Sequence, residues 1–324
     1  MSNPPTRIVS AALALAAASA CGAGNSQPPL PLSESNAAEV AAEALIATDQ
    51  SSFTVQLPTG VLSGVAAAGH HLDRDAVQRL AALAAGPPGA DGTTTSACSA
   101  GGSATVTIAG STVTYAFRDC ADGVTRLDGT LRFTVQQSSP NQASLSASLD
   151  LTVAVGALTF NESGGYTVTV KTAQNPSDST DYELHGDSLS VSLSAGGALR
   201  DDITLSHFDI GISMQLTSTD HQVEHFSYDI DSSRLEGHIS VMTTQDLEQV
   251  IDLVMPREHP FAGQILISGA SHTRLQITIL GDERFTPPAG QGQIELQIDP
   301  GTGTFGAPIW TSWAELSAMV SIAP

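Results

Sequence analysis

Residues 143–155 read "ASLSASLDLTVAV", a stretch in which apolar and small polar side chains alternate almost without a break. Successive side chains of a β-strand point to opposite faces, so this alternation predicts a strand with one apolar and one polar face. A helix would instead repeat its apolar residues every three or four positions. The stretch therefore favours an antiparallel sheet that buries only one face.

The same alternation recurs along most of the chain from residue 103 onward, as in "ATVTIAG", "GTLRFTVQ", "GYTVTVKT", "SLSVSLSA" and "HFSYDI". Segments rich in Gly, Pro, Asn and Ser, such as "SSPNQ", "NESGG", "NPSDSTD" and "SAGGALRDD", are typical of the turns between strands. No βαβ rhythm is visible. We expect a mainly β protein, with a large antiparallel curved sheet, a sandwich or an elongated meander over residues 98–324.

Two short helices are predicted in the region 36–97, before the main body. Residues 36–47 ("NAAEVAAEALIA") place Ala and Val on one face, and Asn36 is a suitable N-cap. Residues 73–85 ("DRDAVQRLAALAA") repeat this pattern and precede Gly86-Pro87-Pro88, which ends a helix. Both apolar stripes are expected to pack against a sheet.

The first twenty residues have the features of a signal peptide, because "MSNPPTR" precedes a short apolar stretch over residues 8–20. The tetrapeptide at positions 18–21, "ASAC", resembles the lipobox of bacterial lipoproteins, which implies lipidation of Cys21. An ordinary A-x-A cleavage site followed by a Cys is the alternative. Gly22 stands where Asp would resemble an inner-membrane signal, which favours the outer membrane. Residues 21–35 are rich in Gly, Pro and Ser and are expected to form a flexible tether.

The cysteine count supports lipidation, because an exported protein with only Cys21, Cys98 and Cys120 has an odd number. Lipidation of Cys21 leaves Cys98 and Cys120 as a predicted disulfide pair, which an oxidising compartment permits. Closing this loop stabilises a fold by roughly 3 kcal/mol. Two Cys residues without a nearby His make a poor zinc site.

The charge of the chain excludes some partners, because 33 acidic residues stand against 12 basic ones. Such a protein repels nucleic-acid phosphates and anionic headgroups. No nucleic-acid partner is therefore expected, and contact with the membrane is expected through the N-terminal lipid anchor. The body would face the periplasm or the cell surface.

Residues 221–225 read "HQVEH", which matches the H-x-x-E-H spacing of inverted zinc proteases. That motif needs a helix, whereas Phe226, Tyr228 and Ile230 alternate with polar residues as in a strand. On a strand the two His would lie about 13 Å apart, too far to share one zinc ion, and Glu224 would point to the opposite face. We interpret the match as coincidental and predict no catalytic residue, no metal and no cofactor.

Two further regions carry a resemblance to a family. Residues 98–135 pair a Cys at a Gly-rich turn with a second Cys ending a strand, and residues 259–316 close with a W-x-x-L motif. With the lipobox, these regions resemble uncharacterised β-rich lipoproteins of Gram-negative bacteria. Some members have an acidic turn before the Trp, whereas this chain reads "IDPGTGTFG" and keeps only Asp299. A Ca²⁺ role for this turn is therefore not expected.

Three functions are compatible with the sequence. The first is an outer-membrane lipoprotein with a non-catalytic β-rich structural or interaction module. The second is a carrier in which a curved sheet encloses an apolar ligand such as a lipid. The third is a hydrolase whose site is assembled in space. A protein partner or an apolar ligand is expected, but the residues do not identify it.

Overall fold

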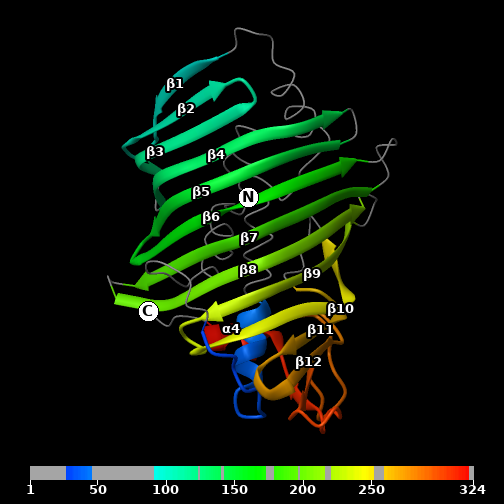
Figure 1. The fold of residues 1–324 in the computed structure, drawn as a ribbon. Helices are drawn as coiled ribbons and strands as arrows, with labels where there is room; N and C mark the ends of the chain where they lie inside the picture. The colour runs from blue at the N-terminus through cyan, green and yellow to red at the C-terminus, as the bar shows by residue number, and fades with distance from the viewer. Residues whose placement is uncertain are drawn as a thin grey trace.

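A single sheet dominates the computed structural model, which describes residues 27–45, 91–122, 125–139, 142–172, 179–195, 198–215, 220–251 and 259–320. Its fourteen strands are antiparallel, and their order in the sheet is their order in the chain (Figure 1). This confirms the predicted mainly β fold as an open meander. The strands are β1 (Gly92–Ala97), β2 (Ser103–Ala109), β3 (Thr112–Asp122), β4 (Thr125–Ser139), β5 (Gln142–Val155), β6 (Leu158–Thr172), β7 (Ser179–Ala195), β8 (Ala198–Gln215), β9 (Asp220–Ser232), β10 (Gly237–Ile251), β11 (Ala262–Ser268), β12 (Arg274–Ile279), β13 (Ile294–Asp299) and β14 (Ile309–Thr311).

The alternation in sequence gives the sheet two different faces. In β5, Leu145, Leu149 and Leu151 are buried, whereas Ser148 and Asp150 between them are exposed. The same pattern continues on neighbouring strands, so one apolar core follows the inner face from β4 to β13. The outer face of the long strands is covered mainly by Ser, Thr, Asp and His side chains.

One predicted turn is wrong. The "NESGG" segment at 161–165 lies inside β6, and the chain turns instead at Gly156, before that strand. Gly164 has a φ of 150° and lies so close to the backbone of Ser188 and Leu189 that a Cβ would clash with it. These glycines therefore allow close packing within the sheet, although the amino-acid composition of the "NESGG" segment is typical of a loop.

The helix predicted over 36–47 is confirmed at residues 37–45, on the inner face of the sheet. Val40 and Ala41 are fully buried, and the Tyr228 hydroxyl of β9 donates a hydrogen bond of 2.8 Å to the Ala44 carbonyl. The helix predicted over 73–85 lies outside the described residues. A 3-10 turn, η1 (Ala270–His272), and a C-terminal helix, α4 (Trp313–Val320), were not predicted.

The segment before the first helix is part of the folded body. The Leu30 N–H donates to the His238 carbonyl, and the Leu30 carbonyl accepts from the Ala270 N–H. Leu32 is buried at 3% exposure. The Gln27 backbone N–H donates to the Asp231 carboxylate at 2.8 Å. The predicted tether over 21–35 is therefore too long, because residues 27–35 pack against the end of the sheet formed by β9 to β12, and residues 21–26 lie outside the described residues.

Candidate functional site

The two edges of the sheet differ, and the β1 edge is open. All six residues of β1, "GTTTSA", are exposed, and in the part of the chain that the structure describes β1 pairs only with β2. The strand carries no charged residue and no Pro. Thr93 and Thr95 form side-chain hydrogen bonds to Thr107 and Thr105 at 3.2 and 2.9 Å.

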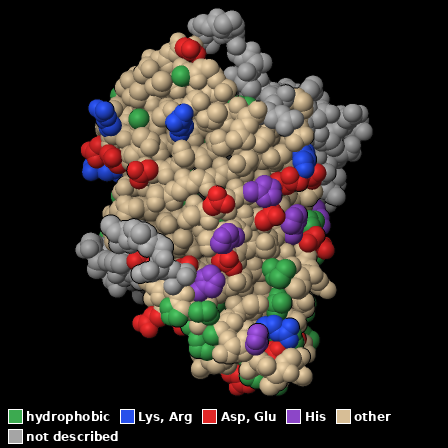
Figure 2. Space-filling view, viewed as in Figure 1, with side chains coloured by type: hydrophobic (Ala, Val, Ile, Leu, Met, Phe, Trp, Pro, Cys, Tyr) green, Lys and Arg blue, Asp and Glu red, His purple; other side chains and the backbone are tan. Residues whose placement is uncertain are grey.

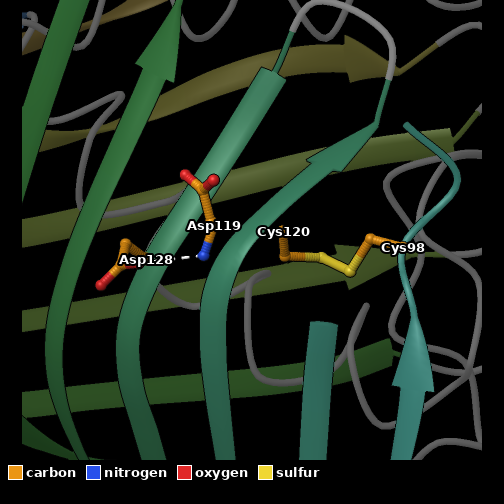
Figure 3. The surroundings of a disulfide bond; sticks show 4 residues. All are labelled: Cys98, Asp119, Cys120 and Asp128. Atoms are coloured by element: carbon orange, nitrogen blue, oxygen red, sulfur yellow. Dashed lines mark hydrogen bonds between the residues drawn. A yellow bond between two sulfur atoms is a disulfide. The ribbon is translucent and has the colours of Figure 1, made fainter. Parts of the chain in front are cut away.

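The predicted disulfide is confirmed beside this edge. Cys98 directly follows β1 and is bonded to Cys120 in β3, with the Cα atoms 5.4 Å apart (Figure 3). The Asp119 backbone N–H donates a 3.0 Å hydrogen bond to the Asp128 carboxylate of β4. The Ala100 and Ala121 backbones are also hydrogen-bonded across the same corner. The end of β1 is therefore fixed covalently to the third strand.

The opposite edge is short and covered at its end. β14 has only three residues, and α4 begins two residues later. The Trp313 indole N–H donates to the Gly281 carbonyl at 2.9 Å, and its ring stacks on His259. A short edge strand followed by a packed helix protects a sheet against pairing with another chain.

The "HQVEH" segment forms part of β9, as predicted. Glu224 is buried on the inner face at 7% exposure, whereas His225 is exposed and its ring lies over Gly211. His221 contacts the Glu248 carboxylate at 3.3 Å. The two His thus have different neighbours, and Glu224 faces away from them.

Histidines on the outer face lie next to carboxylates (Figure 2). His185 contacts Asp209, and His207 contacts Asp229, each at 3.1 Å. His238 contacts Asp231 at 3.2 Å. Within the part of the chain that the structure describes, no three His, Cys, Asp or Glu side chains are grouped closely enough to hold a metal ion.

The Asp299 turn is closed by the chain itself. The Asp299 carboxylate accepts hydrogen bonds from the backbone N–H groups of Gly301, Thr302 and Gly303 at 2.8 to 3.0 Å. Its other oxygen pairs with the Arg274 guanidinium at 2.6 Å. Arg274 and these backbone donors hold the pKa of Asp299 below its ordinary value. The loop therefore satisfies this carboxylate with protein donors.

Glu162, on the inner face, is a buried acidic residue that sequence reasoning missed. Glu162 in β6 is buried at 4% exposure between Leu151 of β5 and Val191 of β7. Its Oε2 atom has no hydrogen-bond partner in the described structure. Burial raises the pKa of this carboxyl to about 7. The only signal in the sequence was a Glu at an apolar position of the alternation, which the neighbouring glycines obscured.

Comparisons with protein-family models, with curated proteins and with solved structures found no match. The resemblance to β-rich lipoproteins therefore stays a prediction. No helix in the described ranges combines the length and apolar character needed to cross a bilayer. Cys21 lies outside the described residues.

Proposed function

We propose that this protein is an outer-membrane lipoprotein, anchored at Cys21, whose β-sheet is a non-catalytic interaction module. The observation that carries the proposal is the docking of residues 27–35 on one end of the sheet. An anchor at Cys21 would be six residues from Gln27, and six extended residues span at most about 20 Å. The β9 to β12 end would therefore lie close to the membrane.

The sheet then extends away from the anchored end. Nine inter-strand steps separate β10 from β1, and at about 4.8 Å each they amount to about 43 Å along the sheet. The polar outer face and the exposed β1 edge would thus be presented to the surrounding compartment. A sheet that presents a polar face in this way suits an interaction module better than a catalytic centre.

Paired polar side chains on the outer face fit an interaction module. Four described histidines, His185, His207, His221 and His238, contact carboxylates on the sheet surface. These contacts hold the side chains in place and give the outer face an ordered polar surface.

Replacement of the proposed acylation residue tests the anchor. We expect Cys21→Ala to abolish incorporation of labelled fatty acid and to move the protein from the membrane fraction to the soluble fraction. Cys98 and Cys120 should stay blocked to alkylation in this variant, which shows that the body is folded. A variant that is still labelled and still sediments with membranes would refute lipidation at Cys21.

A carrier of an apolar ligand is a second candidate, favoured by Glu162. The Oε2 atom of this carboxyl, which has no partner in the described structure, could accept a hydrogen bond from the hydroxyl or amino headgroup of a lipid. Mass spectrometry of organic extracts tests this function: stoichiometric lipid should accompany the wild type and be reduced in Glu162→Leu. Extracts free of lipid from both proteins would leave the interaction module as the proposed function.

A further inference from the structure

We propose that the open edge of β1 binds an extended segment of another polypeptide, which adds to the sheet as a further strand. This inference rests on the proposed function as an interaction module and assigns its binding site. Strand addition derives affinity from main-chain hydrogen bonds and specificity from alternate side chains. Both components can be specified from the β1–β2 hairpin.

Within the described residues, the β1 edge lacks the usual protection against strand pairing. Natural sheets block their edges with charged residues, Pro, bulges, very short strands or covering segments. β1 has six exposed residues without charge or Pro, and its register with β2 contains no bulge. The β14 edge, in contrast, is only three residues long. Of the two edges in the described sheet, the β1 edge is therefore the one that offers a partner more unprotected backbone.

The backbone groups that would bind the partner can be identified. The Cys98 N–H bonds to the Gly102 carbonyl, so this pair is hydrogen-bonded. Antiparallel pairs alternate between hydrogen-bonded and non-hydrogen-bonded types, and the side chains lie closer in the second type. Thr95–Thr105 and Thr93–Thr107 are therefore non-hydrogen-bonded pairs, in agreement with their short Oγ1 distances. Thr93 and Thr95 thus direct their N–H and C=O groups to the open edge.

The strand is held in the geometry that a partner needs. The Cys98–Cys120 disulfide fixes the end of β1 to β3, and two Thr–Thr hydrogen bonds fix its middle to β2. A strand that is already ordered loses less conformational entropy when it binds. The disulfide therefore contributes to affinity as well as to stability.

The side chains define the chemistry of the partner. One face of the hairpin has Thr on both strands, and the other face places Thr94 and Gly92 beside Val106 and Ile108 of β2. Cross-strand pairs of Thr with Thr or Ser stabilise such faces. The matching partner is an uncharged extended segment that alternates Ser or Thr with Val, Ile or Ala. The β2 sequence itself, "SATVTIA", has this pattern.

A second copy of the chain fits the edge less well. Pairing β1 with β1 of another copy would continue the sheet in the opposite direction. The two anchored ends would then lie about 90 Å apart along the combined sheet, on opposite sides of the contact. Two proteins anchored in one membrane cannot easily adopt this arrangement, whereas a segment of another polypeptide can reach the edge freely.

The test uses the lipidated full-length protein in detergent and a fluorescent peptide with the β2 sequence, measured by fluorescence anisotropy. We expect the wild type to bind this peptide more tightly than a scrambled peptide of the same composition. Thr95→Pro removes an N–H at the open edge and leaves the β1–β2 bonds in place, so it should weaken binding by about tenfold. Thr95→Val loses the same side-chain hydrogen bond to Thr105 but keeps the N–H, so it is the matched reference and should lose clearly less affinity than Thr95→Pro.

Two further measurements make the outcome decisive. The disulfide and the thermal unfolding midpoint of Thr95→Pro should match those of Thr95→Val, which shows that the body is intact. Double replacement Cys98→Ser/Cys120→Ser should weaken peptide binding without affecting the anchor. Equal binding of both peptides, equal binding by Thr95→Pro and Thr95→Val, or self-association that only Thr95→Pro abolishes would each overturn the proposal. None of these results depends on acylation of Cys21, so they are distinguishable from failure of the anchor.

Discussion

The buried Glu162 carboxyl makes the stability of the protein depend on pH. Its pKa is raised from 4.5 to about 7 in the folded state. The folded state therefore retains this proton where the unfolded chain has lost it. The resulting stability is fully present below pH 4.5 and is lost as pH rises to about 7. The difference amounts to about 3 kcal/mol in free energy of unfolding.

Glu162→Gln should remove this dependence, because the amide is neutral at every pH. We expect the free energy of unfolding of the variant, relative to wild type, to increase between pH 4.5 and pH 8. Urea denaturation at several pH values measures this difference, in which the titration of all other groups cancels. A difference that stays constant over this range would show that burial does not raise the pKa of Glu162 in the folded protein.

His221 and His225 give a second prediction for single residues. Because they lie on a strand with different neighbours, replacement of both by Gln should leave the metal content of the protein unchanged. The free energy of unfolding should change by no more than about 0.5 kcal/mol, as is usual for surface positions. Metal analysis and denaturation of the double variant test both expectations. Stoichiometric zinc that disappears in the variant would contradict this interpretation.

At the scale of elements, Arg234 joins three parts of the chain. It lies in the turn between β9 and β10, pairs with Glu43 of the first helix and Asp201 of β8, and donates to the Met319 carbonyl of α4. The Glu43 side chain is only 1% exposed. Arg234→Ala would leave this carboxylate buried without its cation, at a cost of about 3 kcal/mol.

A matched pair on the surface provides the control. Arg126 contacts Asp119 at 3.1 Å, but both side chains are more than half exposed. Arg126→Ala should therefore change the free energy of unfolding by less than about 1 kcal/mol. Adding Glu43→Gln to Arg234→Ala should recover part of the lost stability. Similar losses for both Arg variants in chemical denaturation would mean that burial of Glu43 has no role.

Sequence periodicity predicted some of these elements correctly and others not. Strands such as β5 and β9 were predicted because one buried face imposes a period of two. The Gly164-Gly165 pair was misinterpreted as a turn, because glycine chemistry does not distinguish a loop from close packing inside a sheet. The docking of residues 27–35 could not be predicted either, because it depends on hydrogen bonds with residues more than 200 positions away.

The disulfide was the one part of the candidate site that the sequence predicted. Cysteine counting gave the Cys98–Cys120 pair, since an odd number leaves few alternatives. The openness of the β1 edge depends on the order of the strands, and alternation of side chains contains no information about which strand is outermost. The β1 stretch "GTTTSA" was therefore placed within the helical and loop region 36–97, although it begins the sheet.

For the whole molecule, the proposed anchor predicts a defined orientation. A dye on Ser268→Cys, near the docked N-terminal segment, should lie close to the bilayer, whereas one on Thr93→Cys in β1 should lie roughly 40 Å further away. Energy transfer to an acceptor in the lipid headgroups of reconstituted vesicles compares these distances. We expect strong transfer from position 268 and weak transfer from position 93. Equal transfer from both positions would mean that the sheet lies flat on the membrane.

The order of the strands also determines how the chain can fold. Each strand pairs only with its neighbours in sequence, so hairpins can form in succession as the polypeptide emerges. The segment from Gln27 to Leu32 depends on distant residues instead, because its partners, Asp231 and Thr273, are 204 and 241 residues further along the chain. A chain exported N-terminus first must therefore keep this segment undocked until β9 to β12 have emerged. Its docking is the step that completes folding, and until then the proposed anchor at Cys21 would be joined to the sheet only through the intervening polypeptide.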